Sequence, residues 1–456
     1  MAESSLSSVE LCVSVLDQID RLQGALNAYI TVRERNEVIA EARLVDSRRA
    51  DGETFGPLAG IPMGIKDNFA TAGLRTTAGS KILADWIPQH DATVVRKLRE
   101  AGGILVGKHN LHEFADGPTN DNPHFGRPLN PWDRSRMSGG SSGGSAVALA
   151  TGQCLGAVGT DTGGSIRTPA AFCGVVGLKP TYGLVSRAGV VPFSWSLDHA
   201  GPMARTVTDA AILLKVIEGH DPADTGSLAV PSVDPLAEID RGLRGLVFGV
   251  ETTYFTKWMS RGVGEVFSNA LGQIEALGGA VEEVQLPAMR SAPAAELAIL
   301  FPEAAALHAR NLDERAEDYG QDVRLSLLSG RLYRAVDYVL AQRVRSRLKR
   351  DLRESFERID ILFTPTVVIE PPAWGAAAIS LEGGESHEVL ETLVRCLAPF
   401  NLSGYPAISI PAGTGDLGLP IAVQLVGRPF AERELFRAAR DLERAFAPHK
   451  RTPPAG

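Results

Sequence analysis

Two clusters of glycine and serine are the part of the sequence most suited to chemistry. Residues 139–145 read GGSSGGS, and residues 159–165 read GTDTGGS. A glycine-rich segment that is held rigid needs a functional reason, because glycine loses more backbone freedom on folding than other residues. Backbone without side chains can approach a ligand while nearby hydroxyl groups point at it, as a serine hydrolase requires. A flexible linker is the alternative, but the apolar run 146–150 between the clusters disfavours it.

A serine hydroxyl is a weak nucleophile at neutral pH and needs a base. The sequence shows no paired histidine and aspartate pattern of the kind that accompanies a G-x-S-x-G elbow. Lys66 is the better candidate, because it lies in the apolar stretch 58–68, LAGIPMGIKDN, and burial lowers the pKa of an ammonium group. The alternative is that Lys66 extends its ammonium group to solvent from the end of a strand.

Two patterns that are similar to known binding motifs are rejected. Residues 102–109, GGILVGKH, nearly match a phosphate-binding loop, but 104–106 predict a strand and His109 replaces the hydroxyl that binds magnesium. A metal site is suggested only by four residues close in the sequence, His109, His112, Glu113 and Asp116. Their order, H-x-x-H-E, differs from the zinc-protease motif. We therefore predict neither a metal nor a cofactor.

Predicted helices and strands alternate along the rest of the chain. Helices are expected at 8–26, 93–100, 206–218, 264–277, about 294–359 and 432–446, and strands at 103–106, 172–184, 245–250, 280–284, 361–364 and 407–410. This alternation predicts an α/β fold, with a large twisted mixed β-sheet covered by helices on both faces. The polar segment 221–235 marks the best internal boundary. We divide the chain into 1–220 with the catalytic residues, a pocket-lining lobe at 221–360, and 361–456, which completes the sheet of one overall domain.

Composition limits the partners and the compartment. The 456 residues carry a formal net charge of −8, which argues against a general nucleic-acid binder, and the basic run 343–350 is interpreted as an exposed helix face. No signal peptide or membrane span is evident. The 4 cysteines lack C-x-x-C spacing, which favours the reducing cytoplasm. We therefore predict a cytoplasmic protein without a nucleic-acid or membrane partner, and the oligomeric state stays open, a homodimer included.

Five motifs together closely resemble the amidase signature family. They are GIKDN at 64–68, GGSSGGS at 139–145, GTDTGGSIRTP at 159–169, GLKPT at 177–181 and GLPIAVQLVGRP at 418–429. The resemblance covers nearly the whole chain and implies the amidase signature fold. It also implies a Ser–cis-Ser–Lys triad, in which Ser165 is the nucleophile, Ser141 relays the proton and Lys66 is the base.

The resemblance further implies how the triad is supported. The peptide bond between Gly140 and Ser141 is expected to be cis. The oxyanion hole is expected to consist of the backbone N–H groups of Thr162, Gly163 and Gly164, with that of Ser165 as a further donor. Asp161 and Arg167 are expected to pair and hold this loop rigid, and a surface position for Arg167 is the alternative.

The resemblance implies hydrolysis of a small-molecule amide or carbamate C–N bond through a seryl acyl-enzyme, with urethane and urea-type substrates included. The alternative is a glutaminase, the A subunit of a tRNA-dependent amidotransferase complex; a catalytically idle scaffold is a second one. The chain departs from the family pattern at Asp116, which with Gly117 forms the predicted substrate-binding edge. An anionic Asp116 would oppose the free carboxylate of glutamine, whereas Arg343 or Arg345 could bind it.

Overall fold

The structure is a computed structural model that describes residues 6–381, 385–447 and 452–454. Its centre is an 11-stranded mixed sheet with the strand order β1-β3-β2-β4-β6-β5-β12-β13-β9-β7-β8. The strands of this sheet are β1 (Tyr29–Val32), β2 (Pro62–Lys66), β3 (Ile104–His109), β4 (Gly156–Asp161), β5 (Val176–Lys179), β6 (His199–Ala204), β7 (Val247–Val250), β8 (Ala280–Glu283), β9 (Ile361–Pro365), β12 (Ala407–Thr414) and β13 (Pro420–Val426). A separate hairpin contains β10 (Ala378–Ser380) and β11 (Ser386–Glu388).

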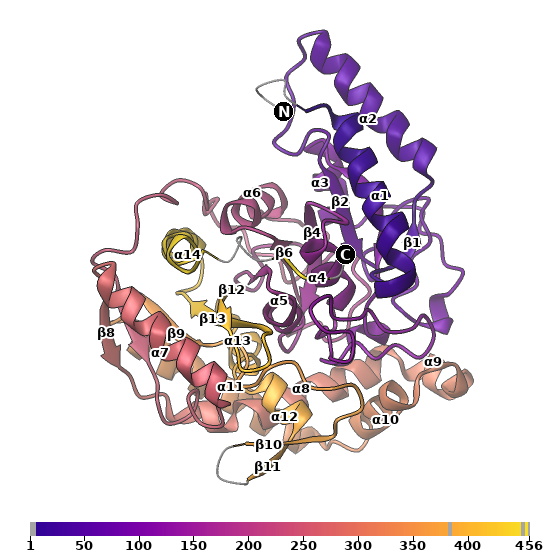
Figure 1. Ribbon diagram of the computed structural model, residues 1–456. Coiled ribbons are helices and arrows are strands. Elements are labelled where there is room, and N and C mark those ends of the chain that lie inside the picture. Colours follow the sequence, from indigo (N-terminus) through magenta and orange to yellow (C-terminus); the bar gives the residue numbers. More distant parts are fainter. Residues whose placement is uncertain (1–5, 382–384, 448–451, 455–456) are drawn as a thin grey trace.

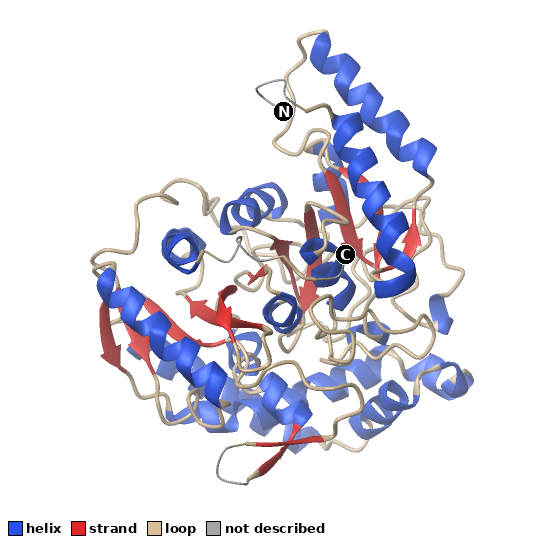
Figure 2. Ribbon diagram, in the orientation of Figure 1, coloured by secondary structure: helices blue, strands red, loops and turns tan. Residues whose placement is uncertain are grey.

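Helices cover both faces of the sheet (Figure 1, Figure 2). They are α1 (Ser8–Leu26), α2 (Arg35–Ala50), α3 (Thr93–Glu100), α4 (Gly143–Ala150), α5 (Arg167–Cys173), α6 (Val207–Ile217), α7 (Arg261–Ala276), α8 (Ala292–Leu307), α9 (Ala309–Glu314), α10 (Gln321–Gly330), α11 (Ala335–Ser355), α12 (Val389–Val394), α13 (Ala398–Ser403) and α14 (Glu432–Phe446). One core contains α3, α6, α7 and α14, whereas α8, α11 and α13 contribute to another. The predicted α/β fold with a mixed sheet is therefore confirmed.

The sheet brings Lys66 close to the second glycine-serine cluster. Strand β2 pairs in parallel with β4, and Lys66 and Asp161 are the last residues of these two strands. The carboxyl ends of neighbouring parallel strands meet at the same edge of a sheet, which is where open α/β sheets bind ligands. Helix α4 begins at Gly143, inside the first glycine-serine cluster, and α5 begins at Arg167, just after the second cluster. The fold thus places both clusters at one sheet edge.

Several predicted elements have the bounds that the periodicity indicated, namely α1, α3 and α14. One of the strand predictions needs correction. Of the short strands expected over 172–184, only Val176–Lys179 is present, because Phe172 and Cys173 belong to the end of α5. The sequence pattern did not predict β13, all seven residues of which are buried, so the alternation of polar and apolar residues that marks a half-exposed strand is absent. Within the described ranges, none of the helices has the length and apolar character needed to cross a membrane.

Candidate active site

Lys66 is buried and directed at a serine. Its side chain is 0% exposed, so the alternative of an ammonium group extended to solvent is wrong. The Nζ atom donates to Ser141 Oγ at 2.7 Å and to Thr160 Oγ1 at 2.8 Å. Thr160 also accepts a hydrogen bond from Asn68 Nδ2 at 3.1 Å. These contacts fix the direction of the lysine side chain toward Ser141.

Burial also sets the protonation state of this lysine. Removal from water lowers the pKa of Lys66 to about 7, and this effect outweighs the nearby carboxylates of Asp161 and Asp198, which act in the opposite direction. A lysine with such a pKa is substantially neutral near physiological pH. The amine can therefore accept a proton from the hydroxyl that it contacts.

The two serine clusters meet beside Ser141. The peptide bond between Gly140 and Ser141 is cis, as the resemblance implied. The backbone N–H of Ser142 donates to the carbonyl oxygen of Ser165 at 3.1 Å. Lys66 and Ser141 are both 0% exposed, whereas Ser165 is 7% exposed. Lys66 and Ser141 therefore lie in the interior and Ser165 lies nearer the surface, so a ligand would reach Ser165 first.

The loop before Ser165 offers backbone donors, with one correction to the predicted oxyanion hole. The N–H of Gly164 donates to Asp161 Oδ1 at 2.9 Å, so this donor is already occupied. In the part of the chain that the structure describes, no acceptor is found for the N–H groups of Thr162, Gly163 or Ser165. Gly164 instead allows the backbone of the loop to turn, because its φ of +117° is a conformation that favours glycine. Thr162, Gly163 and Ser165 are therefore the free donors of the loop.

Asp161 and Arg167 form a pair without solvent exposure. Arg167 Nε and Nη2 donate to the two carboxylate oxygens of Asp161 at 3.0 and 2.9 Å. Both side chains are 0% exposed, so the alternative surface position of Arg167 is wrong. Burial alone would raise the pKa of Asp161, but the charge and hydrogen bonds of Arg167 hold it below its usual value. The pair fixes the turn between β4 and α5.

Two residues that the motifs did not indicate as site residues complete this network. Asn401 Nδ2 donates to Asp161 Oδ1 at 2.8 Å, and Arg167 Nη1 donates to Gln424 Oε1 at 2.7 Å. Gln424 lies inside the motif GLPIAVQLVGRP, which was its only signal in the sequence. Asn401 lies in α13 and had no comparable signal. The C-terminal part of the chain thus supports the loop of the nucleophile.

Removing one member of this pair is expected to destabilise the fold strongly. Asp161→Ala leaves the Arg167 guanidinium buried without its carboxylate, so the free energy of unfolding should fall by about 3–5 kcal/mol. Urea denaturation followed by circular dichroism measures this change. The control is Glu100→Ala, which removes an exposed pair with Arg96 and should cost less than about 1 kcal/mol. Equal effects of the two substitutions would contradict the structural role of Asp161.

The predicted substrate-binding edge lies against the relay segment. Asp116 accepts a hydrogen bond from Ser326 Oγ of α10. Burial raises the pKa of Asp116 to about 7, so the carboxyl is not a permanent negative charge at neutral pH. In the same loop, the N–H of Gly140 donates to the carbonyl oxygen of Pro118 at 2.7 Å, and a side chain at Gly117 would collide with His112. The objection to a carboxylate substrate is therefore weaker than the sequence indicated.

The two arginines considered for carboxylate binding differ in exposure and in contacts. Arg343 is exposed, whereas Arg345 is half-buried and donates from Nη2 to the carbonyl oxygen of Ser196 at 3.0 Å. Its Nε atom is buried and has no partner among the described residues. The loop of Ser196 continues to Asp198, which accepts a hydrogen bond from Thr162 Oγ1 at 2.6 Å. Arg345 therefore adjoins the segment that packs on the oxyanion loop.

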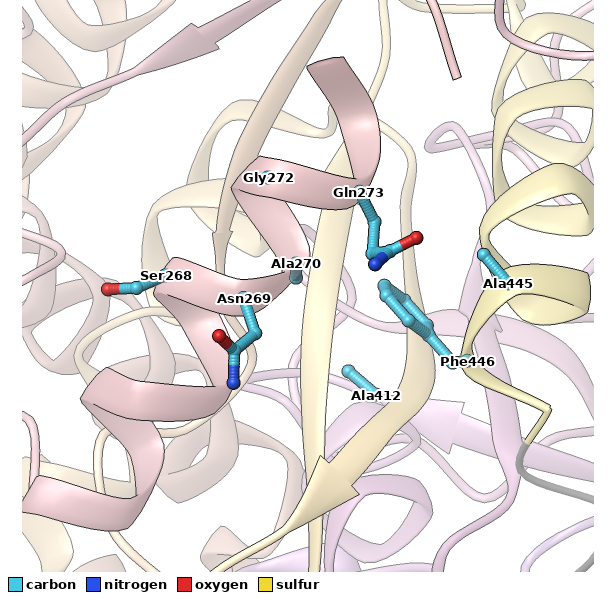
Figure 3. A pocket seen from close by; sticks show the side chains of 8 residues that line it. All are labelled: Ser268, Asn269, Ala270, Gly272, Gln273, Ala412, Ala445 and Phe446. Carbon is cyan, nitrogen blue, oxygen red and sulfur yellow. The ribbon is translucent and has the colours of Figure 1, made fainter. Parts of the chain in front are cut away.

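Figure 3 shows a surface pocket between α7 and α14. Ser268, Asn269 and Gln273 of α7 line it together with Phe446, and none of its lining residues is titratable. It contains none of the triad or loop residues. This pocket is therefore not the candidate active site.

Comparisons with known proteins agree with the geometry. A family model described as Amidase matches residues 10–436. The chain is 41% identical to the A subunit of glutamyl-tRNA(Gln) amidotransferase from Moorella thermoacetica, over 99% of this chain and 96% of the relative. It is similar in structure (TM-score 0.92, 35% identity, 97% and 96% covered) to a chain of a vestigial protein complex that reveals the origins of an s-triazine catabolic enzyme. A peptide amidase from Stenotrophomonas maltophilia has a TM-score of 0.85 at 33% identity, with 99% and 96% covered.

The comparisons correct the expectation about partners. We predicted no nucleic-acid partner, and the similarity to part of an amidotransferase named for glutamyl-tRNA(Gln) contradicts this prediction. The error has a physical reason. A net charge of −8 argues only against broad phosphate binding by the surface of this chain, whereas one chain of a larger assembly can serve a tRNA-dependent reaction without binding the tRNA broadly itself. The same relative favours the glutaminase alternative over hydrolysis of small-molecule amides.

Proposed function

Because the chain belongs to the amidase signature family, we propose that Ser165 attacks a carboxamide carbonyl and cleaves its C–N bond. The observation that carries this proposal is the contact of 2.7 Å between Lys66 Nζ and Ser141 Oγ, made by a lysine whose pKa burial lowers to about 7. Neutral Lys66 takes the proton of Ser141, and Ser141 takes the proton of Ser165. At the same time, the Oγ atom of Ser165 bonds to the carbonyl carbon.

The remaining steps use the loop and the same relay. The free N–H groups of Thr162, Gly163 and Ser165 stabilise the negative oxygen of the tetrahedral intermediate. Ser141 and Lys66 then return the proton to the leaving nitrogen, which departs as ammonia or an amine and leaves an ester on Ser165. Water, deprotonated through the relay, cleaves this ester and restores the free serine. No step requires a metal or cofactor.

We propose L-glutamine as the substrate, with the chain acting as the amidase subunit of a tRNA-dependent amidotransferase. The 41% identity to such a subunit supports this assignment. Arg345 lies beside the segment that packs on the oxyanion loop, and its Nε atom has no partner among the described residues. This arginine therefore supplies a donor for the substrate carboxylate. Asp116 does not oppose this carboxylate when its carboxyl is neutral. We place the reaction in the reducing cytoplasm, in agreement with the cysteines, which are free in the described structure.

A second candidate is a freestanding hydrolase of small amides, with carbamates and ureas included. The observation that favours it is structural similarity, since the TM-score to the s-triazine-related chain is 0.92 and that to the peptide amidase is 0.85. The two candidates share the triad and the acyl-enzyme. They differ in the substrate and in the need for partner subunits.

One assay separates the candidates. The purified chain is given L-glutamine and a panel of amides, carbamates and ureas, with and without the other subunits of an amidotransferase and tRNA. We expect ammonia release from glutamine, and Arg345→Ala should raise KM for glutamine by about tenfold or more because a charge-assisted hydrogen bond is lost. Arg343→Ala is the matched control and should leave KM unchanged. Rapid turnover of other panel compounds with no glutaminase activity under either condition would refute the glutamine assignment.

A further inference from the structure

Helix α8 places a buried carboxyl group against the oxyanion loop. Glu296 lies near the start of this helix and is 2% exposed. A methyl group built on Gly163 would lie 3.4 and 3.5 Å from its two carboxyl oxygens. The carboxyl group therefore packs over the side of the glycine whose N–H is a free donor of the loop. No motif in the sequence indicated this contact.

This carboxyl group has no partner in the described structure. The Oε1 atom is buried without a hydrogen bond, and no hydrogen bond to Oε2 is found within the described ranges. Glu303, further along the same helix and also 2% exposed, has a different environment. It accepts hydrogen bonds from Ser194 Oγ at 2.5 Å and from Tyr338 OH at 2.9 Å. A buried polar group without a protein partner costs free energy, so the unmet capacity of Glu296 is available to a ligand at this position.

The neighbouring protein groups do not supply this partner. Burial raises the pKa of Glu296 well above its usual value, and the charge of Arg167 counteracts this effect only in part. The guanidinium of Arg167 already donates to Asp161, Gln424 and Asn401. Tyr254, which also lies near Glu296, donates its hydroxyl to the carbonyl oxygen of Arg395. These neighbouring groups therefore leave Glu296 free to bind a ligand, and a carboxyl oxygen accepts from an N–H donor in either protonation state.

We propose that Glu296 is a specificity-determining residue that accepts a hydrogen bond from an N–H-bearing nitrogen of the substrate. This nitrogen belongs either to the leaving amino group or to an amino group on the acyl chain, both of which glutamine carries. The inference rests on the proposed amide hydrolysis at Ser165. The hydrogen bond to Glu296 would lower kcat/KM for substrates that lack an N–H group at this position relative to those that carry one.

Three related substrates and two variants test the proposal. The substrates are L-glutamine, the γ-methyl ester of L-glutamate, which lacks the leaving N–H, and glutaramic acid, which lacks the α-amino group. In Glu296→Leu, kcat/KM for glutamine should fall by about tenfold or more relative to one of the two analogues. A change relative to the ester identifies the leaving nitrogen, and a change relative to glutaramic acid identifies the α-amino group. Glu296→Gln, which keeps a carbonyl acceptor, should preserve selectivity for the leaving nitrogen.

A stability measurement separates recognition from a structural role. Because Glu296 has no partner in the described fold, Glu296→Leu should leave the melting temperature unchanged or raise it. A lower melting temperature with both substrate ratios within about threefold of the wild type would overturn the proposal, since the loss of a typical hydrogen bond corresponds to about fivefold. If the wild type hydrolyses another amide of the panel instead of glutamine, the glutamine assignment fails. The same comparison is then made with that amide, with the methyl ester that replaces its amide group, and with the analogue that lacks its amino group.

Discussion

Ser165→Ala is expected to lower kcat/KM by about 10⁴-fold or more, with the fold unchanged, because the acyl group would have no oxygen to which it can be transferred. Ser165 follows the loop of free N–H donors and is the most exposed member of the triad. Ammonia release measures the activity, and circular dichroism checks the fold.

The matched control for this variant is Ser145→Ala. Ser145, in the first cluster, is buried like Ser165, but its hydroxyl contacts His109 Nδ1 at 3.0 Å and not the triad. This control should keep activity within about tenfold of the wild type, since the loss of one neutral hydrogen bond costs about 1 kcal/mol. Equal losses in the two variants would show that the effect of Ser165→Ala is not specific to a nucleophile.

Lys66→Ala should remove most of the rate together with the ascending limb of the pH profile. The neutral amine is the active form, so kcat/KM of the wild type should rise as the pH increases through about 7, where burial places the pKa of Lys66. Without the amine, the proton of Ser141 has no acceptor. Lys66→Arg should fail as well, because a guanidinium does not deprotonate in this pH range. A pH–rate series with the free enzyme measures these differences.

Lys108→Met provides a control for the loss of a buried lysine. Lys108 is also 0% exposed and burial lowers its pKa to about 8, but its Nζ atom donates to the carbonyl oxygen of Phe69 and to Thr76. This variant is expected to lose stability and to keep the ascending limb. An active Lys66→Arg enzyme with an unchanged pH profile would show that another group accepts the proton.

The residues predicted from the sequence are those whose chemistry is encoded locally. Lys66 could be identified from the residues because an ionisable residue in an apolar stretch is costly, whereas the roles of Ser141 and Ser165 came from the resemblance of the glycine-serine motifs to the amidase signature family. The pairing of Asp161 with Arg167 was also accessible, since both residues lie within one turn. Short-range spacing was sufficient in these cases.

The sequence did not indicate groups that reach the site from distant segments. Asn401 approaches Asp161 only after α13 packs against α8 and α11, and Glu296 comes from α8, where the alanine-rich sequence predicts nothing but a helix. The occupied N–H of Gly164 was hidden for another reason, because it depends on the side-chain direction of Asp161. Sequence spacing does not specify such three-dimensional choices.

The central claim is that Ser165 carries the acyl group while Lys66, acting through Ser141, supplies the base. Labelling of the wild-type chain with a fluorophosphonate, followed by mass spectrometry of its peptides, tests this claim most directly. We expect a single modified site at Ser165, formed at a rate that increases with pH through about 7 and that Lys66→Ala nearly abolishes. Modification of Ser141 with none at Ser165 would contradict the account.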